Sequence, residues 1–434
     1  MQQNPMTVIT EILPDQLQKL EAYLTPIGTD IKNNPAIKFS NYQQLHYCTF
    51  FVIPGKHPSE VDTGEPALLA FEANIDGEVK QFIKDLIAGN PDFVNTVYSC
   101  CKDYPGNNAS QLAEYLTKND HGANAFYVAH PGQTRNTIYE QQQIRERTEA
   151  YIDANRAELA AKQPTEIHAD IVKHLGTINK PTPQPFLNSM GQMIFNGLLV
   201  ALGILLVGGF FGMFGPLVEF LAVLALIAGV AFAVLLRWNE MRDKQDDKPW
   251  TVSEQMQAIQ RVEDRQLQNH LTSVIEIKPG WFRLTTLKIV LAGINLVAKL
   301  VATKGDLSGI VTIHFARWVI LPGNKRLLFM SNYDGSWENY LGEFIDHASV
   351  GLTAVWSNTQ LGKDRGFPDT QWLALRGGSR DEQRFKNFAR NSQLAELVWY
   401  SAYIDLSVKN VANNRAIHEG LFSTTNLAAW LKCL

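Results

Sequence analysis

Two long apolar segments, residues 193–214 and 217–236, constrain this chain of 434 residues more than any other feature. Glu219 is the only charged residue inside them. A helix of about 20 apolar residues is long enough to cross the hydrocarbon core of a bilayer. Gly215 and Pro216, which join the segments, do not continue a helix easily. We therefore predict a transmembrane helical hairpin.

The charges that flank the hairpin predict its orientation. Lys173 and Lys180 precede it, Arg237 and Arg242 follow it, and the turn between the helices carries no positive charge. Because cytoplasmic loops are enriched in Lys and Arg, we expect both soluble parts to lie on the cytoplasmic side. The N-terminal residues show no basic stretch followed by an apolar core, so we expect no cleavable signal peptide.

Composition excludes several classes of protein. The net charge of −4 argues against a nucleic-acid-binding protein, which usually carries a basic stripe. The four cysteines form no repeated framework, and we expect them to be reduced thiols. The sequence contains no P-loop, no dinucleotide-binding glycine motif, no serine-hydrolase elbow, no HExxH and no CxxC.

The two soluble parts are diverged copies of one unit. Residues 45–55 read LHYCTFFVIPG and residues 313–323 read IHFARWVILPG. LAFEANIDGEVKQFIKDLI, from Leu69, aligns with LLFMSNYDGSWENYLGEFI, from Leu327, and further on Phe126-Tyr127 aligns with Trp399-Tyr400. In each copy two apolar strands precede an amphipathic helix. This order predicts an α+β fold of two ferredoxin-like modules, each an antiparallel sheet with helices on one face, whose sheets could face each other.

The repeat and the hairpin divide the chain into five parts. We expect the following parts: a first module at 1–146, a helical linker at 147–190, the hairpin at 191–237, a second linker at 238–272, and a second module at 273–434. Residues 281–301 are far more apolar than their counterpart in the first copy. They form either a helix in the plane of the membrane interface or a core helix of the second module.

The repeated Asn-x-Asp-Gly motif places Asp76 and Asp334 at strand ends. Such an aspartate either accepts hydrogen bonds from the first backbone N–H groups of a helix or acts as an acid above a cofactor. His46 and His314 occupy equivalent strand positions and are either core residues or ligands. Arg317 has no counterpart in the first copy, an asymmetry that either a single active site or ordinary divergence would leave.

Three further groups are candidates for binding a cofactor or a metal. His347, and His418 close to Arg415, are each candidate axial ligands of a haem iron. Asp170 and His174 share a helix face at a spacing that suits a metal, but no third ligand is nearby.

The second copy, with GDLSGIVTIHFARWVIL and RLLFMSNYDGSWENYLGEFID, resembles a bacterial membrane-protein family labelled peroxidase-related. The duplicated pattern also resembles the superfamily of dye-decolourising peroxidases and chlorite dismutases, which hold haem in the second ferredoxin-like unit. Residues 331–335 keep only the Asp-Gly of the peroxidase GxxDG motif. The resemblance implies a location in the bacterial inner membrane and some expectation of haem.

Two hypotheses follow. In the first, the protein is a membrane-anchored haem peroxidase or oxygenase acting on a hydrophobic or lipid substrate. His347 or His418 would ligate iron, His314 and Arg415 would line the cofactor site, and Asp334 and Arg317 would polarise a bound peroxide. In the second, the protein is a non-catalytic module that binds a lipid or a protein partner at the bilayer. A homo-oligomer or a larger membrane complex is compatible with either.

Overall fold

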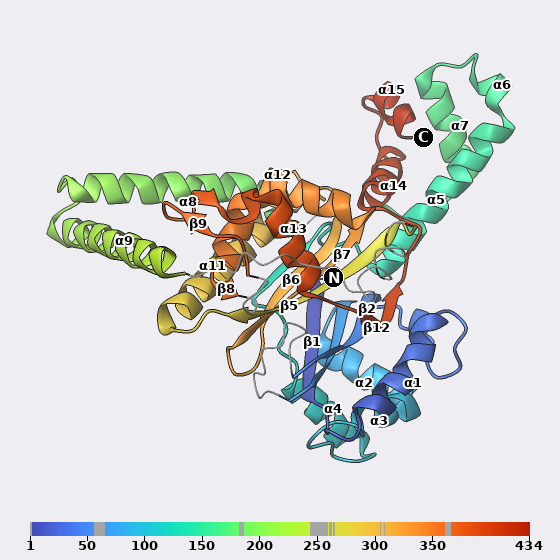
Figure 1. Cartoon of the computed structure of the whole chain (residues 1–434). Coiled ribbons are helices and arrows are strands. Elements are labelled where there is room, and N and C mark those ends of the chain that lie inside the picture. The colour runs from blue at the N-terminus through green and yellow to red at the C-terminus, as the bar shows by residue number, and fades with distance from the viewer. Residues whose placement is uncertain are drawn as a thin grey trace.

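The computed structural model describes residues 2–55, 66–181, 186–243, 259, 263, 265–303, 305–307, 309–360 and 366–434. Two antiparallel sheets lie at the centre of the molecule, with helices on their outer faces, and a pair of long helices projects from one side (Figure 1). The protein is thus a mixed α/β chain with antiparallel sheets and long apolar helices, as the sequence predicts at this coarse level.

The first sheet has the strand order β1-β3-β2-β12. Its strands are β1 (Gln3–Glu11), β2 (Leu45–Ile53), β3 (Leu68–Asp76) and β12 (Glu396–Ser401). One face is covered by α1 (Leu17–Thr29), α2 (Val79–Gly89), α3 (Pro91–Tyr98) and α4 (Ala109–Lys118). A short 3-10 helix, Phe39–Asn41, precedes β2.

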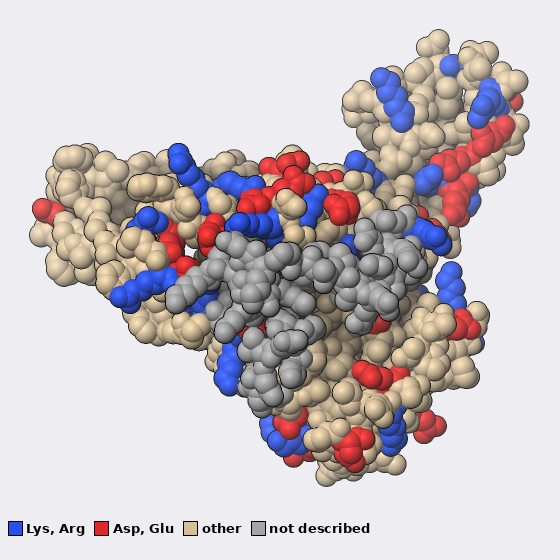
Figure 2. Space-filling view, in the orientation of Figure 1, with Lys and Arg blue, Asp and Glu red and all other residues tan. Residues whose placement is uncertain are grey.

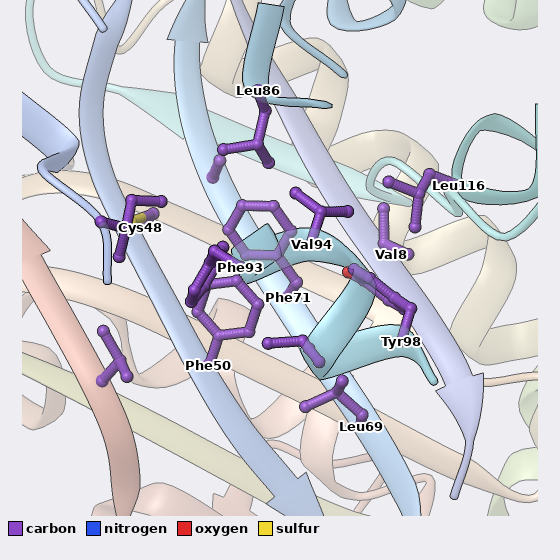
Figure 3. Close-up of a cluster of buried hydrophobic side chains, with 14 of the residues drawn as sticks. Val8, Cys48, Phe50, Leu69, Phe71, Leu86, Phe93, Val94, Tyr98 and Leu116 are labelled. Atoms are coloured by element: carbon purple, nitrogen blue, oxygen red, sulfur yellow. The ribbon is translucent and has the colours of Figure 1, made fainter. Parts of the chain in front are cut away.

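The core of the first module lies between this sheet and its helices (Figure 3). The Phe50 and Phe71 rings of neighbouring strands stack with their centroids 4.1 Å apart. Phe93 of α3 meets Phe50 edge-on at 5.7 Å. On α2 the buried residues include Phe82, Ile83 and Leu86, which confirms the predicted amphipathic helix.

The second sheet has the strand order β11-β5-β7-β6-β4, and the short β8 (Thr359–Gln360) also pairs with β5. Its strands are β4 (Ala125–Val128), β5 (Gln268–Ile277), β6 (Ile313–Ile320), β7 (Arg326–Asp334) and β11 (Gln393–Leu394). Its covering helices are α11 (Trp281–Leu300), α12 (Trp337–Trp356) and α13 (Glu382–Asn391). The short strands β9 (Thr370–Gln371) and β10 (Arg376–Gly377) form a separate ribbon before the 3-10 helix Gly378–Arg380.

Each sheet has one edge strand from the other half of the chain. The repeat aligns Phe126-Tyr127 with Trp399-Tyr400, but β4 pairs with β6 of the second copy, and β12 pairs with β2 of the first. The contact of α1 with β12 is tight, since a Cβ atom on Gly28 would lie 1.9 Å from the Leu397 carbonyl oxygen. The soluble parts are therefore interlocked, which a division of the chain into consecutive modules does not reveal.

The inner faces of the two sheets pack against each other, as the sequence led us to expect. A shared apolar cluster contains Ile9, Phe51 and Ala70 from the first sheet and Val319, Leu328 and Met330 from the second. A second cluster at the other end of the interface contains Tyr47, Ile138, Phe315, Tyr403, Leu406 and Val411. Polar and charged side chains lie on the same inner faces, and they form the site described below.

The predicted hairpin consists of α8 (Phe186–Phe210) and α9 (Pro216–Arg242). Both helices, and α11 as well, are long and apolar enough to cross a membrane. The outward faces of α8 and α9 are exposed, and close approach of Gly209 to Val218 and Ala222 joins the two helices. By contrast, Leu287 and Leu291 of α11 are buried in the core of the second sheet and its helices, while Trp281, Ile289 and Leu296 are exposed.

The connecting segments form a lobe beside the sheets (Figure 1). It contains α5 (Arg135–Ala154), α6 (Arg156–Leu159), α7 (Pro164–Leu175), α14 (Val408–Gly420) and α15 (Leu427–Trp430), and the chain closes on the 3-10 helix Leu431–Cys433. Ile144, Ile171 and Trp430 are among the residues of its small core. Residues 182–185 of the predicted first linker and most of the predicted second linker, 238–272, lie outside the described residues.

Candidate functional site between the sheets

The first copy places a histidine beside the repeated aspartate. A register shift between Leu45 and Tyr47 of β2 brings His46 to the end of β3, where Asp76 lies. The His46 Nε2 and Asp76 Oδ1 atoms are 3.1 Å apart, an ion-pair distance whose angle is not that of a hydrogen bond. The other Asp76 oxygen accepts a hydrogen bond of 2.8 Å from the backbone N–H of Arg135, the first residue of α5.

The second copy repeats this arrangement atom for atom. The register shift between Ile313 and Phe315 presents His314, whose Nε2 lies 2.7 Å from Asp334 Oδ1. Asp334 Oδ2 accepts from the backbone N–H of Val408, the first residue of α14, at 2.7 Å. Both aspartates thus bind the positive N-terminal end of a helix, where a carboxylate is stabilised.

These helices are not the ones that the motif suggests. The sequence predicts that Asp76 and Asp334 cap the helices that follow them directly, α2 and α12. Instead α12 is capped by the Ser336 hydroxyl. The aspartates accept from the first backbone N–H groups of α5 and α14, which begin far along the chain and have Thr134 and Ser407 as their N-caps. The physical reason is tertiary, since the chain after β4 begins α5 beside the end of β3, and the chain after β12 begins α14 beside the end of β7.

Aromatic and polar side chains fill the space between the two dyads. The Tyr403 hydroxyl lies 2.8 Å from His46 Nδ1, and the Tyr47 hydroxyl donates to Gln268 at 3.1 Å. Burial lowers the pKa of His130 to about 4, so its neutral ring donates from Nε2 to the Val408 carbonyl at 3.0 Å. The cavity that His46, His130 and His314 help to line measures about 10 Å³, which is room for one water molecule.

A second group of buried side chains, the inter-sheet charge cluster, joins the sheets near their centre. It consists of Glu72 on β3, His270 on β5, Arg317 on β6 and Glu396 on β12. Glu72 lies 3.1 Å from Arg317 and 2.9 Å from His270 Nε2. The other ring nitrogen of His270 lies 3.0 Å from Glu396. Because both nitrogens face carboxylates, both carry protons and the ring is a cation.

The cations and carboxylates of this cluster shift one another's pKa. Burial of His270 opposes its charge, but Glu72 and then Glu396 raise its pKa to about 9. Burial would raise the pKa of Glu72, yet Arg317 and His270 hold it below its usual value. Burial also lowers the pKa of Arg317, an effect that Glu72 opposes. The two cations and two carboxylates balance, which is the condition under which buried charges are tolerated.

Arg317 is turned toward the first sheet rather than toward Asp334. Its guanidinium donates to the carbonyl oxygens of Met6, at 2.7 Å, and Ala73, at 3.0 Å, and also to the Asn74 side chain. The structure therefore brings Arg317 together with Glu72, and it brings Asp334 together with His314. Arg317 and Asp334, the two candidate catalytic residues, therefore belong to separate hydrogen-bonded clusters.

The other predicted site residues have contacts of their own. His347 is exposed on α12 and touches Gly309. His418 is buried on α14, where its Nε2 donates to the Asn179 carbonyl at 2.8 Å. Arg415 pairs with Glu419 at 2.6 Å on the same helix. In addition to burial, the positive charge of Arg415 helps to lower the pKa of His130, which lines the cavity beside His46 and His314.

These positions do not fit a haem. His314 and His418 already bind Asp334 and a backbone carbonyl, and the cavity beside His314 has room for one water molecule. The space between the second sheet and its helices is filled by aromatic side chains, among them Phe329, Tyr340 and Trp356, around a cavity of about 20 Å³. Drug-sized ligands occupy pockets of roughly 300 Å³ or more.

Asp170 and His174, whose spacing on the helix suits a metal, each contact another side chain. Asp170 binds Lys162 at 2.7 Å, and the His174 ring stacks on Tyr151 with centroids 4.4 Å apart. Among the described residues, no group of three or more His, Cys, Asp or Glu side chains is placed to hold a metal ion.

Sequence reasoning missed Glu72, His270 and Glu396. One signal was present, because the repeat aligns Glu72 with Met330 and Arg317 with Thr49. Each copy thus has one charged residue on an apolar strand where the other copy has an uncharged one, and the two charges, Glu72 and Arg317, have opposite signs. His270 lies just before the start of the second copy as the repeat defines it, so alignment of the copies could not find it. Comparison of the chain with family models, with curated proteins and with solved structures finds no match.

Proposed function

We propose that this protein is a non-catalytic, membrane-anchored module that binds a partner at the bilayer surface. The observation that carries the proposal is the state of its reactive side chains. Asp76, Asp334, His46, His314 and Arg317 are all buried and bound within the protein. Groups held in this way stabilise a rigid fold and are not available to a substrate.

Two further parts of the proposal concern ancestry and location. The sheets share the strand order of their first three strands, the position of a register shift and the His–Asp–helix arrangement. These shared features support two ferredoxin-like modules derived by duplication, with one strand exchanged. The excess of Lys and Arg around the hairpin supports a bacterial inner-membrane protein whose soluble parts face the cytoplasm.

The first module has a surface that suits a protein partner. An open groove of about 600 Å³ runs between α2 and α4. Lys80, Lys84 and Lys118 line it together with Ile87 and Ala113, and Glu114 is the one acidic residue in the lining. A cationic rim over an apolar floor is complementary to an acidic amphipathic segment.

The haem hypothesis supplies the sharpest test of the non-catalytic proposal. The full chain is purified in mild detergent, and its visible absorption is recorded with and without added haemin. We expect a colourless protein with no saturable uptake of haemin. A Soret band of one haem per chain, shifted by His347→Ala or His418→Ala, would overturn the proposal and support a haem peroxidase or oxygenase.

The groove is tested by photo-crosslinking of the full chain in its membrane. A photoreactive amino acid at Ala113, which lines the groove, is compared with one at Gln111 on the opposite side of α4. We expect a defined adduct from position 113 only, and its loss in the Lys84→Glu variant. The same adducts from both positions would contradict a partner site in the groove.

A further inference from the structure

An apolar tip lies where the ribbon of β9 and β10 turns, at residues 372–375. Trp372 is 60% exposed, Leu373 is 40% exposed and Leu375 is 70% exposed. A loop on the surface of a soluble domain is usually polar, and a group of large exposed apolar side chains marks a site of interaction. We refer to residues 372–375 as the apolar tip.

The apolar tip is fixed to the base of the transmembrane hairpin. Glu240, in the last turn of α9, accepts hydrogen bonds from the backbone N–H groups of Leu373, at 2.9 Å, and Ala374, at 2.5 Å. Arg237 lies 3.3 Å from Glu240 and places its guanidinium 5.2 Å from the centre of the Trp372 ring. The tip is therefore held at the level of α9 where its apolar part ends.

The backbone of the tip is strained. Trp372, Leu373 and Ala374 have φ values of 56°, 62° and 62°, in the left-handed region. This conformation costs roughly 1 kcal/mol or more for a residue with a side chain. The two hydrogen bonds to Glu240 offset part of this cost. Strain of this kind persists where the conformation serves a function, and here it presents Trp372 and Leu373 to the exterior.

Other aromatic residues lie at the same level of the hairpin. Trp238 is 50% exposed and has the Arg242 guanidinium 4.0 Å from its ring centre. Trp281, the first residue of α11, is 71% exposed, and the neighbouring Phe282 packs on Phe232 of α9 at 5.6 Å. Tryptophan and arginine side chains gather where a membrane protein meets the headgroups.

The distribution of charged side chains agrees with a membrane interface at the base of the hairpin. The hairpin surface in Figure 2 is nearly free of charged side chains, and Lys and Arg gather where it joins the rest of the molecule. A bilayer that surrounds α8 and α9 would end at this level, so the tip and Trp281 would meet the same layer of headgroups.

We infer that the apolar tip inserts into the membrane interface beside the hairpin, and that the exposed face of α11 lies along the same surface. The occupant of this surface is the lipid bilayer, because the tip is continuous with the hairpin. The inference rests on the proposed membrane anchoring. Together, the tip and α11 would hold the second module against the bilayer.

The test places an environment-sensitive fluorophore on single cysteines of the full chain. Cys433→Ser serves as the background, since Cys48, Cys100 and Cys101 are buried. The probe is attached at Leu375→Cys, with Trp372→Cys as a second reporter of the tip. Val207→Cys, on the exposed face of α8, reports the hairpin, and Ser110→Cys, on exposed α4, is the control. The chains are reconstituted into phosphatidylcholine–phosphatidylglycerol vesicles with or without lipids that carry a nitroxide quencher.

We expect quenching by about two-fold or more at positions 375 and 207 and none at position 110, since a buried interfacial group contacts the lipid. Quenching at position 207 without quenching at position 375 or 372 would overturn the inference. The apolar tip would then be a binding site for a protein partner and not for lipid. Absence of quenching at 207 would show that the hairpin is outside the bilayer, and the proposed anchoring would fail together with the inference.

Discussion

Arg317 on the second sheet binds several residues of the first sheet at once. It is 1% exposed and binds Glu72 together with Met6, Thr7, Ala73 and Asn74 of the first sheet. Removal of one partner from a buried ion pair leaves the other charge without compensation, which costs about 3–5 kcal/mol. We expect Arg317→Met to lower the free energy of unfolding by this amount, measured by urea titration in detergent. Arg156→Met, which removes a surface pair with Asp153, is the control, and an equal effect would contradict the role of Arg317.

His270 makes the stability of the fold depend on pH. Its pKa is about 9 in the folded protein and near 6.5 when unfolded. The stabilisation is therefore complete below the unfolded value and is lost as the pH rises through 9. The shift corresponds to on the order of 3 kcal/mol. We expect the difference in Tm between the native chain and His270→Gln to shrink between about pH 7 and pH 10. A constant difference would show that the ring is neutral.

At the scale of elements, Asp334 connects β7 to the start of α14. Its substitution by asparagine keeps the shape of the side chain but removes the charge that faces the helix N-terminus. Loss of this contact costs about 1 kcal/mol, and we expect exchange of the first α14 amide hydrogens to become about five-fold faster. The measurement is hydrogen–deuterium exchange of the peptide that contains Val408. Asp346→Asn, on the exposed part of α12, is the matched control. Equal exchange rates in the two variants would contradict a role for Asp334 in stabilising the start of α14.

The edge strand β12 depends on the absence of a side chain at Gly28. A Cβ atom there would meet the Leu397 carbonyl oxygen at 1.9 Å, so either α1 or β12 must move. We expect Gly28→Ala to reduce the stability by about 2 kcal/mol, as overpacking does. Gly342→Ala, on α12 where a Cβ atom meets nothing within 4 Å, should instead stabilise its helix slightly. Similar Tm values for the two variants would show that the α1–β12 contact is loose.

At the scale of the whole molecule, the hairpin projects from one side of an interlocked pair of sheets (Figure 1). With α8 and α9 across the bilayer, as proposed, both soluble parts lie on the same side of it. We expect alkaline phosphatase to be active when inserted at Gly215, in the turn, and inactive when fused after Leu434. β-Galactosidase fusions at the same positions should give the opposite result. Phosphatase activity of the fusion at Leu434 would contradict the orientation that the flanking charges predict.

Much of the local structure could be predicted from the chain alone. The apolar segments predict α8 and α9, and the strand–strand–helix order of each copy predicts β2, β3 and α2 and their counterparts. These features depend on periodicities within a few residues, which a sequence displays directly. The partners of Asp76 and Asp334 could not be predicted in this way. They are backbone N–H groups, which every residue except proline possesses, so the sequence carries no mark that distinguishes Arg135 and Val408.

From the sequence alone follow the segments that are apolar enough to cross a bilayer and the alternation of strands and helices in the soluble parts. Hydrophobicity and its period decide these properties locally. Only the tertiary structure decided which strand completes each sheet and which charges meet. Glu72 and His270, for example, are 198 residues apart in the chain yet lie 2.9 Å apart. Such pairings arise because the two inner faces pack in one particular register, and that register depends on all of the contacts between the sheets at once.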